Sequence, residues 1–351
     1  MLQCFALKRA VEKLGHTAIV INYISEKQYD NNSLYRKKQG IKGYIKNVLL
    51  LPFAGGRKRR DLSFRQFREQ FLTADEKRLL CNDELHSYII DNRFDVVISG
   101  SDQVWNPNVF DFEDSFFYPF ELQAKKIGYA VSLGSATVEQ LQPYKKWIEQ
   151  FDKITVREQK SAKILFDLAQ RASQEVSDPV LLHNKDFWLQ YTEKSQDSYM
   201  ACYFVREEDM GVKLAMAKRL AEKMHLKLKV IDLRITKYNL TNHIYFDRSP
   251  FDFLTLLSNA EYVYTDSFHG TVFSLIFEKN FTTVESDTET LDSRKRNILK
   301  KVGLTSRVQN VNESARILDP IDYSAVTPRI TALRNESLEL LSKLLEQTTA
   351  D

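Results

Sequence analysis

Polar side chains follow a short apolar segment in the first third of the chain. Residues 95–99 are Asp-Val-Val-Ile-Ser, and the turn after them contains Ser101, Asp102 and Gln103. A carboxylate such as Asp102 can orient or deprotonate a substrate hydroxyl, and Ser and Gln side chains can bond the oxygens around it. The sequence therefore predicts a substrate-binding turn here. The alternative is that Asp102 only caps the turn that follows it.

His269 is the strongest single candidate for proton transfer. It lies in Asp-Ser-Phe-His-Gly-Thr, residues 266–271, between an apolar segment and a helical pattern. An imidazole has a pKa near about 6.5, so it can gain or lose a proton at neutral pH, and a helix amino end favours an anion beside it. The alternative is a histidine that caps the helix or fills the domain edge, and Asp266 is expected to brace this turn rather than react. The neighbours expected in the substrate site are Ser267, Gly270 and Thr271.

Two arginines are placed where they could bind an anion. Arg157 follows residues 153–156 and precedes a helical stretch, and Arg294 follows Leu-Asp-Ser at 291–293. A guanidinium binds carboxylate or phosphate through paired hydrogen bonds. The alternative for Arg157 is an ion pair with Glu158 or another neighbouring acid. The two residues after Arg294, Lys295 and Arg296, are expected to be a solvated charge run.

The elements that must position these groups are short apolar strands. Four of them, residues 95–99, 127–131, 153–156 and 261–265, each run directly into polar side chains, with Ser132 after the second. Strands that are continuously apolar suit a parallel sheet covered on both faces, and ligands collect at the carboxyl ends of such strands. From residue 199 onward strands and helices alternate, which predicts a second α/β region. The strands are expected at 199–205, 227–231, 261–265 and 281–284, and the helices at 208–224, 251–259 and 270–278.

The length of 351 residues predicts two domains. We expect an amino-terminal α/β domain over 1–177, a carboxyl-terminal α/β domain over 178–321, and a helix over 322–351 that packs back on the first domain. The predicted class is α/β, with two Rossmann-like domains facing across a cleft, as in GT-B glycosyltransferases. Clefts of this kind commonly bind ligands, and the analogy raises group transfer as a class of chemistry.

Composition excludes several functions. A net charge of +3 gives no reason to expect nucleic acid as a partner. Cys4, Cys81 and Cys202 have no Cys-x-x-Cys spacing, and the six histidines form no His-x-x-x-His pair, so neither a disulfide framework nor a metal site is expected. There is no apolar stretch of membrane-spanning length and no signal peptide, which predicts a cytoplasmic protein.

One segment of the chain is strongly basic. Between Arg36 and Arg68 there are eleven Lys or Arg residues and one acid, Asp61. We expect a helical basic insertion in the first domain over 33–80, with an amphipathic helix at 41–49 that ends at the Gly-Gly pair 55–56. The hypothesis is peripheral contact with the anionic inner face of the membrane, where each cation contributes about 1 kcal/mol. The alternative is a solvated helix and loop whose apolar face packs on its own protein.

Six stretches, taken in order, match the motifs of one protein family. They are residues 100–107 (GSDQVWNP), 128–134 (GYAVSLG), 155–158 (TVRE), 178–182 (DPVLL), 265–271 (TDSFHGT), and Asp292-Ser293-Arg294 with Gly303-Leu304. On these motifs the chain resembles the polysaccharide pyruvyl transferase family over roughly residues 1–310. The resemblance implies a two-lobed glycosyltransferase-like fold and transfer of a pyruvyl group from phosphoenolpyruvate onto sugar hydroxyls. The product would be a ketal in cell-surface glycan synthesis.

The resemblance also implies roles for residues. Arg157 and His269 match positions that the family uses for donor binding and proton transfer. The expected mechanism has His269 as acid, Arg157 on the donor, Asp102 on a sugar hydroxyl, and no cofactor besides the donor substrate. Hydrogen bonds are expected from Ser101, Gln103 and Ser132. The expected acceptor is a glycan or a lipid-linked sugar.

The chain departs from the family pattern at two places. Some members have Arg-Leu-His where this chain has Ser267-Phe268-His269, so Arg294 or another cation must compensate. Members also usually begin with a strand and an Asn-Tyr-Gly turn, whereas this sequence starts inside the helix expected at 2–14, so the first strand is expected to be missing. Two alternatives stay open: a GT-B glycosyltransferase that uses a nucleotide sugar, and an inactive scaffold relative.

Overall fold

The computed structural model describes residues 1–24, 51–73, 78–109, 111–240, 244–286, 294–313 and 316–346. The chain forms two compact units. Unit 1 comprises Met1–Gln39, Arg68–Leu182 and Ala332–Asp351, and unit 2 comprises Gly40–Phe67 and His183–Thr331. The sequence predicts a domain boundary after residue 177, and in the structure the chain passes from unit 1 to unit 2 after Leu182.

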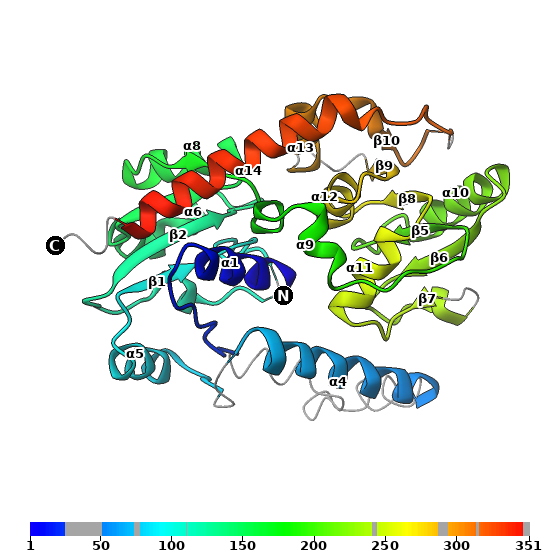
Figure 1. Ribbon diagram of the computed structural model, residues 1–351. Coiled ribbons are helices and arrows are strands. Elements are labelled where there is room, and N and C mark those ends of the chain that lie inside the picture. The colour runs from blue at the N-terminus through cyan, green and yellow to red at the C-terminus, as the bar shows by residue number, and fades with distance from the viewer. Residues whose placement is uncertain are drawn as a thin grey trace. The chain divides into compact units, whose positions relative to one another are not determined.

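Unit 1 contains a parallel sheet whose strands, among the described residues, are ordered β1-β2-β3-β4. Figure 1 labels its first two strands, β1 and β2. The strands are β1 (Val96–Ser99), β2 (Lys125–Val131), β3 (Lys153–Val156) and β4 (Gln174–Glu175). Ile98 pairs with Ile127, and Ile127 pairs with Lys153. The strands expected at 95–99, 127–131 and 153–156 are confirmed. Because all four run in parallel, the side chains that follow them emerge at one edge of the sheet.

Both faces of this sheet are covered by helices. Val97 on β1 packs into a cluster with residues of α5 (Asn82–Asp91), α6 (Val138–Leu141), α7 (Lys145–Glu149) and α8 (Gln159–Ala169). Val96 and Ile98 point the other way, to α1 (Leu2–Lys13) and the later part of α14 (Tyr323–Glu346). Alternate residues of one strand thus enter two cores, which is why the strand carries no polar alternation.

Unit 2 contains a second parallel sheet, ordered β10-β9-β8-β5-β6-β7 in the described part of the chain. Its strands are β5 (Tyr199–Tyr203), β6 (Lys227–Ile231), β7 (Ile244–Tyr245), β8 (Tyr262–Thr265), β9 (Asn280–Glu285) and β10 (Val308–Asn310). From β5 the chain first builds the sheet outward through β6 and β7, and then continues on the other side of β5 with β8. This reversal makes the carboxyl ends of β5 and β8 the switch point at which open α/β sheets bind ligands.

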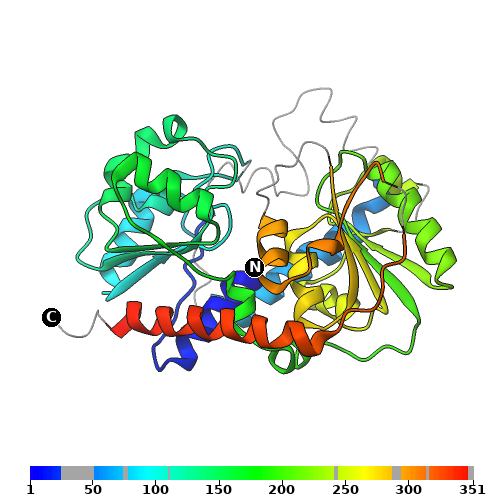
Figure 2. The same cartoon turned by 90° about the horizontal axis from the view of Figure 1, so that it is seen from above.

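Helices cover both faces of the second sheet as well. Helix α10 (Met210–Lys223) lies on one face, and α11 (Pro250–Ser258) and α12 (Phe268–Ile276) lie on the other (Figure 2). Two further helices of unit 2 are α9 (Lys185–Leu189) and α13 (Arg294–Val302). The alternation of strands and helices expected from residue 199 onward is confirmed.

The described part of the basic segment is helix α4 (Ala54–Phe71), whose first fourteen residues are grouped with unit 2. Arg59 Nη2 lies 2.7 Å from Asp247 Oδ2, and a Cβ on Gly56 would lie 2.5 Å from the Phe246 ring. Glycine therefore permits close packing in the first turn of α4, and the Gly-Gly pair begins a helix instead of ending one. The helix predicted at 41–49 lies outside the described residues. None of the helices in the described ranges is both long enough and apolar enough to cross a membrane.

Candidate functional site

At the carboxyl edge of the unit 1 sheet, Arg157 joins the ends of three strands. It directly follows β3, and its Nη2 donates to Asp102 Oδ1, beyond the end of β1, at 2.9 Å. Its Nη1 donates to Asp178 Oδ2, beyond the end of β4, and that oxygen also accepts from Gln3 Nε2 on α1 at 2.8 Å. One guanidinium thus connects β1, β3, β4 and, through Asp178, the first helix.

The members of this cluster differ in exposure. The side chains of Arg157 and Asp178 are 2% and 0% exposed, whereas that of Asp102 is 44% exposed. Burial acts to lower the pKa of the Arg157 guanidinium, but the carboxylates of Asp178 and Asp102 outweigh it and raise that pKa above its ordinary value. Arg157 therefore stays charged, and Asp102 is the member that a dissolved substrate can reach. That Arg157 binds the donor stays a prediction.

Two of the other polar residues predicted at this edge, Ser132 and Gln103, bond other side chains of the protein, whereas Ser101 does not. Ser132 Oγ donates to Glu158 Oε1 at 2.7 Å, and Gln103 Oε1 accepts from Asn106 Nδ2 at 2.7 Å. Ser101 is 6% exposed, and its hydroxyl has no hydrogen-bond partner in the described structure. The turn itself is anchored by the buried Trp105, whose Nε1 donates to Ser99 Oγ at 3.0 Å.

In unit 2, His269 lies in the first turn of α12, directly after β8. Ser267 caps this helix, because its Oγ accepts from Gly270 N at 3.3 Å. Thr271 Oγ1 bonds the carbonyl of Ser267 at 3.0 Å and Thr283 Oγ1 at 2.8 Å. Three residues predicted to bind substrate therefore hold the turn together. His269 in this turn is partly exposed, and its Nε2 is buried.

Arg294 lies beside this turn. It begins α13, and its guanidinium carbon is 5.3 Å from the centre of the Phe268 ring, which in turn is 5.3 Å from the ring of His269. A cation over an aromatic face is held there by the charge distribution of the ring. The amino end of α12 thus combines a guanidinium, an imidazole and the positive end of a helix, an arrangement that favours a bound anion.

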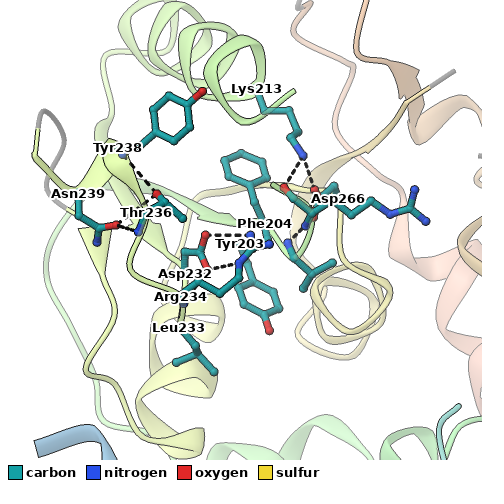
Figure 3. A network of polar contacts seen from close by, with 12 residues as sticks. Tyr203, Phe204, Lys213, Asp232, Leu233, Arg234, Thr236, Tyr238, Asn239 and Asp266 are labelled. Carbon is teal, nitrogen blue, oxygen red and sulfur yellow. Dashed lines mark hydrogen bonds and ion pairs between the residues drawn. The ribbon is translucent and has the colours of Figure 1, made fainter. Parts of the chain in front are cut away.

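Asp266, between β8 and α12, is the centre of a buried network (Figure 3). Its Oδ1 accepts from Val205 N at 2.7 Å, and its Oδ2 accepts from Lys213 Nζ at 2.6 Å. Sequence reasoning expected Asp266 to brace its own turn, but the carboxylate bonds the loop after β5 instead. Asp266 therefore joins the two strand ends at the switch point of the sheet.

Lys295 corrects a second expectation. The sequence predicted a solvated charge, but Lys295 is 4% exposed and its Nζ donates to Asp266 O at 3.0 Å and Val284 O at 2.9 Å. Helical spacing contained a signal for this burial, because Lys295 shares a face of α13 with Ile298, Leu299 and Val302. Lys213, which sequence reasoning did not select, likewise shares the buried face of α10.

Two further features lie near this network. Arg234 makes a two-pronged ion pair with Asp232, with Nε to Oδ1 and Nη2 to Oδ2 both at 2.9 Å (Figure 3). Burial acts to lower the pKa of Arg234, and the bond to Asp232 more than offsets it, so that pKa is raised. A small surface hollow is lined by residues that include Lys213, Asp266 and Glu285. Among the described residues no three His, Cys, Asp or Glu side chains form a group that could hold a metal ion.

Comparison of the sequence with known protein families matches it to the polysaccharide pyruvyl transferase model over residues 1–288. The chain belongs to the polysaccharide pyruvyl transferase family. The resemblance expected from the motifs is thereby confirmed, and this family is one of transferases. A search of curated proteins finds no match.

Solved structures resemble this family member in fold. UDP-N-acetylglucosamine 2-epimerase from Rickettsia bellii aligns with a TM-score of 0.52 and 10% identity, over 99% of this chain and 93% of the epimerase. S. aureus MnaA, in a co-structure with UDP, aligns with a TM-score of 0.51 and 11% identity, over 96% of this chain and 87% of MnaA. At such low identity the likeness concerns the fold alone. The predicted α/β, GT-B-like class is confirmed.

Proposed function

We propose that this protein transfers a pyruvyl group from phosphoenolpyruvate to two hydroxyls of a sugar, forming a ketal in the synthesis of cell-surface glycans. Family membership supports the transferase class. The observation that carries the finer proposal is the turn after β8, where His269 and Arg294 flank Phe268 at the amino end of α12. An anionic donor that must also be protonated needs these two kinds of group together.

The reaction requires one proton gain at carbon and two hydroxyl deprotonations. An acid protonates the methylene carbon of phosphoenolpyruvate while a sugar oxygen bonds to its central carbon and that hydroxyl loses its proton. The carbon–oxygen bond to phosphate then breaks, phosphate leaves with the electron pair, and a second sugar oxygen bonds to the same carbon and loses its proton. The products are the ketal and inorganic phosphate.

In this scheme His269 is the acid and Arg294 binds the phosphate or the carboxylate of the donor. Asp102 is the group that orients a sugar hydroxyl or accepts its proton, because its carboxylate is 44% exposed while Arg157 holds it from the buried side. We assign Arg157 to holding Asp102, since two carboxylates already occupy its terminal nitrogens. This assignment replaces direct donor binding by Arg157 as the working hypothesis.

The acceptor in this proposal is a glycan or a lipid-linked sugar, and the reaction takes place in the cytoplasm. Peripheral membrane contact through residues 36–68 stays part of the hypothesis. Its described portion includes the exposed residues Lys58 and Arg65 on α4, next to Leu62, whose surface is 47% exposed. Exposed cations beside an exposed apolar side chain suit an anionic lipid surface.

The test is incubation of the protein with phosphoenolpyruvate and a panel of glycosides, with phosphate release and the ketal methyl signal followed together. Replacing His269 by Ala should lower turnover by about 10²–10⁴-fold, the usual range for a general acid. His225→Asn is the matched control, because His225 is exposed and lies at the end of α10 in a backbone conformation that Asn tolerates. Turnover of His269→Ala close to that of the wild type would refute the role.

The same assay separates the alternatives. A glycosyltransferase would release no phosphate from phosphoenolpyruvate but would bind uridine or guanosine diphosphate sugars. An inactive scaffold would do neither. Ketal formation by the wild type is the result that supports the proposal.

A further inference from the structure

Two buried lysines bind Asp266, the residue directly after β8 and three positions before His269. Lys213 on α10 reaches the Asp266 carboxylate, with Nζ to Oδ2 at 2.6 Å, and also bonds Arg206 O at 2.9 Å. Lys295 on α13 reaches the Asp266 carbonyl at 3.0 Å. Lys213, Asp266 and Lys295 are each 4% exposed. One residue is thus held by its side chain from one helix and by its main chain from another.

The bonds extend to the neighbouring strands. The carboxylate of Asp266 accepts from Val205 N, beyond the end of β5, at 2.7 Å. Lys295 Nζ also donates to Val284 O on β9 at 2.9 Å. Since β8 lies between β5 and β9, residue 266 is fixed to both of its neighbours in the sheet. A carbonyl that is fixed also fixes the plane of the peptide that begins Ser267, the cap of α12.

Burial of these ammonium groups is not explained by stability alone. Removing an ammonium from water is costly, and an apolar side chain of similar length at such a position is often as stable or more so. Lys213 and Lys295 both occupy faces of their helices that are otherwise apolar. Their hydrogen bonds instead fix positions in the fold, because an ammonium that donates to several oxygens determines where those oxygens lie.

We propose that Lys213 and Lys295 are positioning residues that fix the turn between β8 and α12 and thereby the imidazole of His269. The functional part of this inference rests on the proposed role of His269 as the acid. The structural part, that these lysines determine the position of the imidazole, is independent of that role. Lys295 is the more direct of the two, since it holds the main chain from which the turn continues.

The experiment compares Lys295→Met and Lys213→Met with Lys300→Met and Lys218→Met, which alter exposed lysines on the same two helices. Imidazole signals of His269, assigned by their loss in His269→Ala, are recorded by NMR for each protein. We expect them to shift and broaden in Lys295→Met and Lys213→Met and to stay in place in the controls. With phosphoenolpyruvate, kcat should fall on the order of 10²-fold, because small displacements of a reacting group cost that much. KM should stay within about threefold, since Arg294 is untouched, and Lys295→Arg should recover most of kcat.

The outcomes separate the two hypotheses. Unchanged His269 signals in a folded Lys295→Met and Lys213→Met, with kcat within twofold of the wild type, would overturn the positioning role. If the wild type releases no phosphate from phosphoenolpyruvate, the proposed function fails, and the NMR comparison still decides the positioning role. Should neither Met variant fold, Lys295→Gln decides it, because the shorter amide cannot hold both carbonyls: displaced His269 signals support the role, and wild-type signals in a folded Lys295→Gln refute it.

Discussion

The two units hold their strand ends in opposite ways. In unit 1 a buried arginine, Arg157, lies between the carboxylates of Asp102 and Asp178. In unit 2 a buried aspartate, Asp266, is bound by the ammonium groups of Lys213 and Lys295. Counted over these residues alone, the first cluster has one carboxylate in excess, and the second has one cation in excess. The two clusters are thus opposite in sign.

This difference bears on which ligand groups each cluster favours. Phosphoenolpyruvate is strongly anionic, so it is favoured by Arg294 and the amino end of α12 in unit 2. A sugar hydroxyl needs an acceptor, and Asp102 supplies an exposed carboxylate at the sheet edge of unit 1. The comparison teaches that the sign of the buried charge cluster, and not the strand arrangement, distinguishes the two edges.

The largest effect is expected from breaking the cluster of unit 1. Replacing Arg157 by Met leaves Asp178, whose side chain is 0% exposed, as a buried carboxylate without its cation. We expect a loss of about 3–5 kcal/mol in the free energy of unfolding, measured by urea denaturation.

Two further variants test that explanation. Arg157→Met combined with Asp178→Asn should be more stable than Arg157→Met alone, because the uncompensated charge is then gone. Lys163→Met, which removes an exposed ion pair with Asp167 on α8, should leave the urea midpoint unchanged. Equal midpoints for Arg157→Met and Lys163→Met would contradict the argument.

A smaller effect is expected from breaking the cluster of unit 2. Asp266→Asn removes the carboxylate charge that pairs with Lys213 but keeps an oxygen that can accept from Lys213 or from Val205 N. We expect a loss of about 2–3 kcal/mol in the free energy of unfolding, the range for hydrogen bonds to charged groups. Asp167→Asn serves as the exposed control. A variant as stable as the wild type would mean that the lysines do not depend on this carboxylate.

The smallest effect on stability is expected at Asp102. Because this side chain is 44% exposed, Asp102→Asn should cost about 0.5–1 kcal/mol in the free energy of unfolding. Ketal formation should nevertheless fall by about 10²–10⁴-fold, since the carboxylate that handles the sugar hydroxyl is gone. Turnover that falls only in proportion to the unfolded fraction would give Asp102 a purely structural role.

Much of the fold could be predicted from local patterns. The strands expected at 153–156 and 227–231 coincide with β3 and β6. A short apolar run flanked by polar turns is typical of a buried strand. The turns that carry Asp102 and His269 were predictable for the same reason. They come directly after such runs, where parallel sheets expose their carboxyl ends.

The partners of these residues could not be predicted. Lys213 meets Asp266 across 53 positions, Lys295 meets it across 29, and Arg157 meets Asp178 across 21. Nothing local specifies which distant carboxylate a buried cation will meet, because that depends on how the helices are laid over the sheet. Charged side chains on otherwise apolar helix faces were the available signal.

The late position of α14 in the sequence has a consequence for folding during synthesis. This helix begins in unit 2 and ends in unit 1, where Leu341, Leu344 and Leu345 join a core with Ile127 and Tyr129 of β2. A ribosome synthesises β2 early and these leucines only after all of unit 2. Until then α1 covers this face of the nascent first sheet without α14, so unit 1 completes its core only after unit 2 has been translated. Chaperones that bind exposed apolar strands have that interval in which to act.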